Sequence, residues 1–156
     1  MVEKDNNQSS APVPLSKNEK VEAKNLLAEA DMLRKVPPPL LEVLVGQMKA
    51  RVFQKNETML EQDQESDRMY MVKSGEYKRI RVNPDTGKSQ TVEFAIKAHS
   101  INTMRILSGE PVFANVECIS DKCKVFEIMR PNFLHALQTH PEIATRIAEG
   151  LCEDLR

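Results

Sequence analysis

Few residues of this sequence have the types and the spacing that chemistry at an active site requires. The histidines are His99, His135 and His140, and no two have the H-x-H spacing with which a strand holds a metal ion. Ser74 and Ser108 each precede a glycine, but neither lies in the G-x-S-x-G pattern of a nucleophile elbow, and no glycine-rich phosphate loop is present. We therefore expect no catalytic residue, no metal and no cofactor, and a protein that is not an enzyme.

The three cysteines, Cys118, Cys123 and Cys152, form no C-x-x-C pair. An odd number without such a pair favours a reducing compartment over a disulfide framework. Cys118 and Cys123 flank an expected hairpin turn and could face each other across it. A disulfide between them is one interpretation, but two reduced strand residues are favoured.

The charges of the chain are nearly balanced, with 22 Lys and Arg against 23 Asp and Glu. This balance gives no reason to expect a nucleic-acid partner. No apolar run approaches the roughly 20 residues that a membrane span needs, and the polar start does not resemble a signal peptide. We expect no insertion into a membrane, and a cytoplasmic protein or the cytoplasmic part of a larger assembly.

One short basic segment could bind an anion. Tyr77, Arg79 and Arg81 alternate with Lys78 and the apolar residues that follow it. Such a strand is either a binding patch or a solvated outer face. The second is the commoner outcome for charged side chains, and we favour it.

The elements that must position any site are helical at both ends of the chain. Residues 1–15 are polar and aperiodic and predict a disordered tail. Ser16 and Glu19 have the form of a capping box before a helical region over residues 17–48, which prolines interrupt at Pro37. Helical patterns return over residues 131–156.

Between these ends the hydrophobic period changes from helical to two, which predicts short strands over residues 51–129. The runs are 51–54, 58–62, 68–74, 76–83, 89–98, 112–119 and 122–129. Asn83 to Gly87 is a good hairpin loop between two of them. Many short strands with turn residues between them indicate a sandwich, jelly roll or barrel, in one domain over residues 16–156.

The last helix carries an apolar stripe that repeats every four residues, at Ile143, Ile147, Leu151 and Leu155. Such a stripe drifts around the helix, so part of it can pack on the core while the far end turns away. We predict that Leu151 and Leu155 are more exposed than Ile143 and Ile147 and that they contact a protein partner. The alternative is that all four pack against residues 21–33.

The pattern within this layout is similar to that of a known family. Residues 59–82 combine an apolar strand, a polar turn, a strand with Tyr70, and Gly75 before an alternating strand. With the strand and helix at 126–141, this pattern resembles the cyclic-nucleotide-binding domain, from about residue 26 to the end. The resemblance implies a regulatory domain with a mainly β fold, a jelly-roll barrel flanked by N- and C-terminal α-helices.

In this family a phosphate-binding cassette holds the ligand, and residues 101–116 align with it without a gap. Pro111 and the apolar positions of the cassette are kept, but the ligand contacts are not. Asn102 replaces the family's glycine, Thr103 its ribose-binding glutamate, Val112 its phosphate-binding arginine and Asn115 its terminal polar residue. Gly109 and Glu110 could instead be aligned with the family's consecutive glycine and ribose-binding glutamate, but they lie directly before Pro111. That alignment leaves no residues for the cassette helix, so we reject it, and with it the interpretation of the chain as an ordinary cyclic-nucleotide receptor.

The substitution at Val112 removes a guanidinium fork, since valine has no donor. Charge-assisted hydrogen bonds contribute about 1.5–3 kcal/mol each, so losing two weakens binding by about 10²- to 10⁴-fold. Two residues are candidate replacements. Arg105 could reach a ligand or lie in solvent, and Phe113 could fill the vacated pocket or belong to the strand core.

The resemblance and the degenerate cassette together predict a non-catalytic regulatory or interaction module that does not bind cAMP or cGMP in the usual way. In the family, the helix behind the barrel passes ligand-induced movement to an attached effector domain or partner. The alternative is a small-molecule sensor with a nucleoside-like, uncharged ligand, since Val112 disfavours an anion. A pocket filled by Val112 and Phe113 favours the module, and an open cavity favours the sensor.

Overall fold

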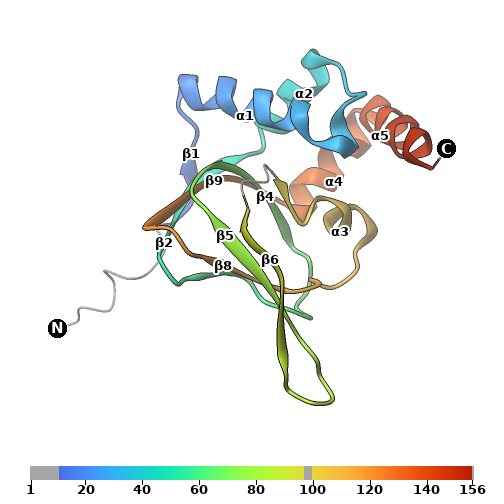
Figure 1. Cartoon of the computed structure of the whole chain (residues 1–156). Coiled ribbons are helices and arrows are strands. Elements are labelled where there is room, and N and C mark those ends of the chain that lie inside the picture. The colour runs from blue at the N-terminus through green and yellow to red at the C-terminus, as the bar shows by residue number, and fades with distance from the viewer. Residues whose placement is uncertain (1–10, 97–99, 156) are drawn as a thin grey trace.

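The segments with period-two alternation form two antiparallel sheets that face each other (Figure 1). The structure, a computed structural model, describes residues 11–96 and 100–155, with the backbone alone for residues 91–96. The larger sheet has the strand order β1-β2-β9-β4-β7 and the smaller one β3-β8-β5-β6. The strands are β1 (Val13–Pro14), β2 (Lys49–Gln54), β3 (Thr58–Leu60), β4 (Arg68–Ser74), β5 (Tyr77–Val82), β6 (Ser89–Ile96), β7 (Ser100–Ile101), β8 (Asn115–Cys118) and β9 (Lys122–Met129).

The mainly β jelly-roll fold with flanking helices is confirmed, but the expected barrel is not closed. The strands β1 and β7, which end the larger sheet, have two residues each. Among the described strands, neither is hydrogen-bonded to the smaller sheet. Closure of a barrel requires hydrogen bonding across every pair of neighbouring strands.

Helices cover one side of the larger sheet and one end of the jelly roll (Figure 1). They are α1 (Lys17–Glu29), the 3-10 helix η2 (Asp31–Leu33), α2 (Pro38–Val45), α3 (Thr103–Ser108), α4 (Arg130–Thr139) and α5 (Pro141–Asp154). The predicted capping box is present, because the Glu19 carboxylate accepts from the Ser16 amide at 2.8 Å and the Ser16 hydroxyl from the Glu19 amide at 3.2 Å. Proline in the first turn starts α2, α4 and α5, where its missing N–H costs no hydrogen bond.

The expected disordered tail over residues 1–15 is contradicted at residues 13–15, which are ordered. Val13 and Pro14 pair with Ala50 and Lys49 of β2, and the side chain of Leu15 is buried. An edge strand tolerates Pro14, since the edge needs no further donor there. Residues 1–10 lie outside the described residues.

Two apolar cores meet at the larger sheet, and β4 contributes to both. Its residues Met69 and Met71 pack with the helices, whereas Tyr70 and Val72 lie between the sheets. The Tyr70 hydroxyl donates to the carbonyl of Met59 at 3.1 Å, and burial raises the pKa of Tyr70 to about 12. The alternation of apolar side chains therefore serves both faces of the sheet.

The C-terminal helix α5 is buried at its start and exposed at its end. Ile143 and Ile147 are 0% and 2% exposed, Leu151 is half-buried, and Leu155 is 86% exposed. The predicted order of exposure is confirmed. The alternative, in which all four pack against residues 21–33, does not hold for Leu155.

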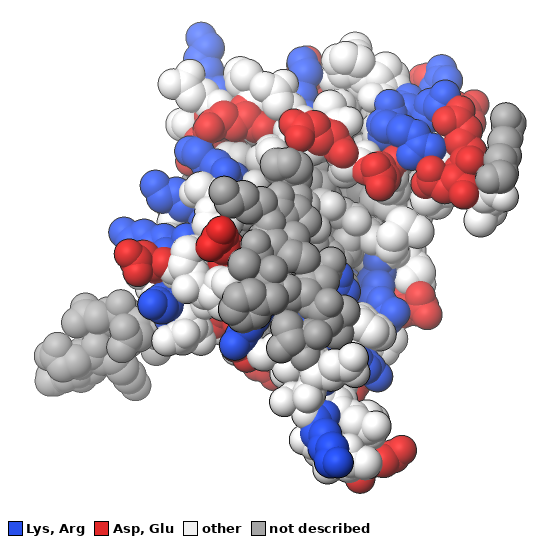
Figure 2. All heavy atoms as spheres, viewed as in Figure 1, with Lys and Arg blue, Asp and Glu red and all other residues white. Residues whose placement is uncertain are grey.

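Ion pairs tie the end of α5 to the segment after η2. The Arg34 guanidinium donates to the Gly150 carbonyl and the Asp154 carboxylate, each at 2.9 Å, and Lys35 pairs with Glu153 at 2.6 Å. Figure 2 shows the positive and negative side chains intermingled over the visible face. Among the described helices, none has the length and apolarity to cross a membrane.

Candidate functional site

Residues 101–116, in which the sequence predicts the family cassette, contain the short helix α3 with a left-handed residue at each end. Asn102 precedes the helix with a φ of 69°, and Gly109 follows it with a φ of 83°. The Asn102 side-chain amide donates to the carbonyl of Arg68 at 3.0 Å. Asparagine is one of the few non-glycine residues that adopt this conformation readily. It can therefore stand where the family has glycine.

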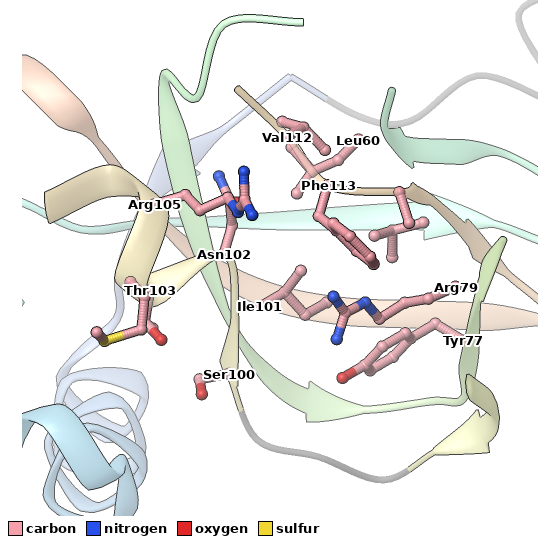
Figure 3. Close-up of a pocket in the computed structure, with 13 residues that line it drawn as sticks. Leu60, Tyr77, Arg79, Ser100, Ile101, Asn102, Thr103, Arg105, Val112 and Phe113 are labelled. Atoms are coloured by element: carbon pink, nitrogen blue, oxygen red, sulfur yellow. The ribbon is translucent and has the colours of Figure 1, made fainter. Parts of the chain in front are cut away.

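A cavity of about 230 Å³ lies between α3 and the smaller sheet (Figure 3). One wall comes from β7 and α3, and the other from β3, β5 and the segment that leads into β8. The lining residues are Leu60, Tyr77, Arg79, Ser100, Ile101, Asn102, Thr103, Met104, Arg105, Val112, Phe113, Ala114 and Val116.

Five of the six pocket residues predicted from the sequence line this cavity, and Asn115 does not. Asn115 belongs to β8, where it pairs with Ile80, while its neighbour Val116 pairs with Arg79. Side chains of successive strand residues point to opposite faces, so Val116 lines the cavity and Asn115 faces away. Its side-chain oxygen accepts from the Gln62 amide at 2.8 Å and anchors a loop.

Val112 forms part of the cavity wall and is 3% exposed. Its backbone is fixed by two hydrogen bonds, one from its amide to the Gln64 carbonyl at 2.9 Å and one from the Asp63 amide to its own carbonyl at 2.8 Å. The valine side chain offers no hydrogen-bond donor to the cavity.

Phe113 does not belong to the strand core, because β8 begins at Asn115 and the Phe113 side chain is 36% exposed. Its ring points toward the other residues that line the cavity (Figure 3). The guanidinium of Arg81 lies 4.7 Å from the ring centre, that of Arg105 5.5 Å and that of Arg79 5.9 Å. These are cation–π distances. Arginines from α3 and β5 therefore meet at this ring.

Arg105 projects from α3 toward the cavity rather than into bulk solvent (Figure 3). Its guanidinium donates to the Pro111 carbonyl at 2.6 Å. The neighbouring Arg81 donates to the Phe113 carbonyl. Both bonds brace the segment 111–113 and hold the two guanidinium groups close to the cavity.

Arg79 overturns the expectation of a solvated basic strand. Tyr77, two residues earlier on β5, is 1% exposed and also lines the cavity. Lys78 points to the opposite face, where its ammonium lies 3.9 Å from the carboxylate of Glu117. The alternation of Tyr77 with Arg79 is the sequence signal that places Arg79 on the inner face.

Other reactive groups contribute nothing to this cavity. Cys118 and Cys123 are free and buried between the sheets. Burial raises the pKa of the Cys123 thiol to about 12, so the thiol stays protonated at neutral pH. Within residues 11–96 and 100–155, no cluster of His, Cys, Asp and Glu could hold a metal ion.

The fold and the cavity beside α3 define a class of regulatory domains with a jelly-roll pocket. Residues 50–140 match the family model of the cyclic nucleotide-binding domain. Because this match covers more than half of the 156 residues, the chain belongs to the cyclic nucleotide-binding domain family. A search of curated proteins gives no significant match.

Solved structures of low sequence identity share the fold. A candidate cyclic nucleotide binding protein from Ruegeria pomeroyi is 23% identical to this chain, with a TM-score of 0.75. The match covers 90% of this chain and 60% of that protein's chain. The regulatory domain of Toxoplasma gondii PKA with cAMP is 16% identical with a TM-score of 0.70, covering 78% and 46%. This chain thus spans less than two thirds of either relative.

A third similar structure is the regulatory subunit of a cAMP-independent protein kinase A from Trypanosoma brucei. It is 18% identical with a TM-score of 0.67, covering 81% of this chain and 45% of its own. A triple mutant of that subunit, in which one substitution replaces a threonine with an arginine, is bound to cAMP in its A site.

Proposed function

We propose that this chain is a regulatory domain that does not respond to cyclic nucleotides in the usual way and binds a different small molecule in its jelly-roll pocket. The observation that carries the proposal is the open cavity beside α3, whose wall includes Val112, the residue that we align with the family's phosphate-binding arginine. Of the two interpretations left by the sequence, an open cavity favours the sensor over a module with a filled pocket.

The lining of the cavity argues against a cyclic nucleotide. Val112 offers no donor to a cyclic phosphate, and Thr103 is shorter than glutamate and uncharged. The cAMP-independent relative from Trypanosoma brucei supports the idea that this fold can work without cAMP.

Contacts of α3 support a regulatory role. Thr103 and Met104 of α3 line the cavity and also a groove of about 570 Å³, which Leu151 of α5 and its C-cap residue Leu155 line as well. A ligand that shifts α3 therefore changes the shape of this groove beside the end of α5. We assign to the end of α5 the contact with an attached effector domain or protein partner in the cytoplasm, in line with relatives that are longer than this chain.

Titration with cAMP and with cGMP tests the proposal directly. We expect no saturable heat in isothermal titration calorimetry up to about 100 μM nucleotide, because two charge-assisted hydrogen bonds to the phosphate are missing. A single-site isotherm in the low micromolar range, with either nucleotide, contradicts the proposed function.

The exposed end of α5 is expected to be dispensable for folding. The Leu155→Glu variant should melt within about 2 °C of the wild-type protein, since this side chain is 86% exposed. The matched control Ile147→Ala removes a side chain that is 2% exposed and should lower the melting temperature by about 5 °C or more. Scanning calorimetry measures both. A comparable fall for Leu155→Glu shows instead that the end of α5 belongs to the core.

A further inference from the structure

Three guanidinium groups surround the ring of Phe113 at the edge of the cavity, at the distances given above. Like charges repel each other, and this repulsion is strongest where protein atoms replace water. Arg79 and Arg105 are both half-buried and both line the cavity. Positive charge is thus concentrated at one end of a small cavity.

The described lining residues offer no negative charge in return, since none is Asp or Glu. Arg105 and Arg81 form no ion pair within the described part of the chain. Each guanidinium donates one hydrogen bond to a carbonyl oxygen. A guanidinium carries five N–H donors in a fork that matches carboxylate and phosphate oxygens. Arg105 therefore keeps donors that a ligand in the cavity can accept.

Much of the remaining cavity wall is apolar. Leu60, Ile101 and Val116 line it beside the arginines and are each less than a tenth exposed. At about 30 Å³ for each molecule, the volume of about 230 Å³ corresponds to about eight waters. A ligand that matches both kinds of lining residue has one anionic group and a small apolar body.

We propose that the cavity binds a small organic anion, a carboxylate or a phosphate monoester with an apolar body, whose oxygens pair with Arg105. The inference rests on the proposed function and names its ligand class. It replaces the sequence-based expectation of an uncharged ligand, which considers Val112 alone. Here the anion is bound from Arg105 of α3 instead of from position 112.

Phenyl phosphate and benzyl alcohol form the pair of probes that tests this inference, because they share an aromatic body and differ in charge. In calorimetry, we expect the wild-type protein to bind phenyl phosphate at least about tenfold more tightly than benzyl alcohol. The affinity for phenyl phosphate should fall with added salt, whereas that for benzyl alcohol should not.

Substitutions then locate the site. Arg105→Gln keeps a donor for the Pro111 carbonyl but removes the charge, and it should weaken phenyl phosphate binding about tenfold. Arg146→Gln is the matched control, because Arg146 lies on the exposed face of α5 and pairs with Glu142 and Glu149. Its affinity should equal that of the wild-type protein. Circular dichroism verifies that both variants are folded.

The inference is wrong if benzyl alcohol binds as tightly as phenyl phosphate, or if folded Arg105→Gln binds phenyl phosphate as well as the wild-type protein does. Equal weakening by Arg146→Gln also overturns it, since the effect then comes from overall charge. These outcomes are distinct from failure of the proposed function, which shows as micromolar binding of cAMP or cGMP.

Discussion

Replacing Gly75 with alanine is expected to lower the free energy of unfolding by about 2–6 kcal/mol. The total free energy of unfolding of a typical domain is only about 5–15 kcal/mol. Gly75 has a φ of 105°, a conformation that residues with a Cβ rarely adopt. A Cβ there would meet the carbonyl oxygen of Lys122 and would lie 2.8 Å from Cys123 Cα. Both are backbone atoms at the start of β9, where Lys122 and Cys123 pair with β2, so they cannot easily move.

Gly87 offers a matched control for this experiment. It also has a positive φ, of 73°, but a Cβ there would have no neighbour within 4 Å. Gly87→Ala should therefore cost only the backbone strain, about 1–2 kcal/mol. Urea unfolding followed by circular dichroism measures both variants. If Gly75→Ala is no less stable than Gly87→Ala, the close approach of β9 to Gly75 is not what requires glycine.

Restoring the cassette is expected to create binding of cyclic nucleotides. The triple variant Asn102→Gly, Thr103→Glu, Val112→Arg should bind cAMP about 10²- to 10⁴-fold more tightly than the wild-type protein, because the arginine supplies two charge-assisted hydrogen bonds. The backbone is compatible with the substitution at each position. The φ of residue 102 suits glycine, residue 103 is the first of α3, and the backbone of residue 112 is held by hydrogen bonds.

The double variant Asn102→Gly, Thr103→Glu is the control, since it lacks only the arginine. Calorimetry should show it at least about tenfold weaker than the triple variant. Phe113 lies at the edge of the cavity and is the side chain that can obstruct the larger ligand. A folded variant that adds Phe113→Ala to the triple set and still ignores cAMP contradicts the alignment of residues 101–116 with the cassette.

Much of the fold could be predicted because its signals are local. The capping box of Ser16 and Glu19, the first-turn prolines and the period-two runs each act within a few residues. Strand ends are less well predicted. Residues 112–114 read as strand, but the strand begins at Asn115, because Val112 bonds to the loop residues Asp63 and Gln64 instead of to a sheet.

The pairing of Val13 and Pro14 with β2 was not predictable in the same way. Nothing in a polar stretch with several prolines indicates a strand, and its partner lies more than 30 residues away. The edge of β2 creates the pairing, together with the burial of Leu15. A long-range contact thus gave structure to a segment with no local preference for it.

For the candidate site, the sequence by itself determined the prediction that the ligand contacts of the family are missing, since Asn102, Thr103 and Val112 are read directly from a segment aligned without a gap. Only the tertiary structure decided which side chains line the cavity beside them. The register of β5 against β8 sets Arg79 opposite Val116 and turns Asn115 away. Register depends on contacts between distant segments, so no local pattern could show that Arg79 and Arg105 meet at Phe113.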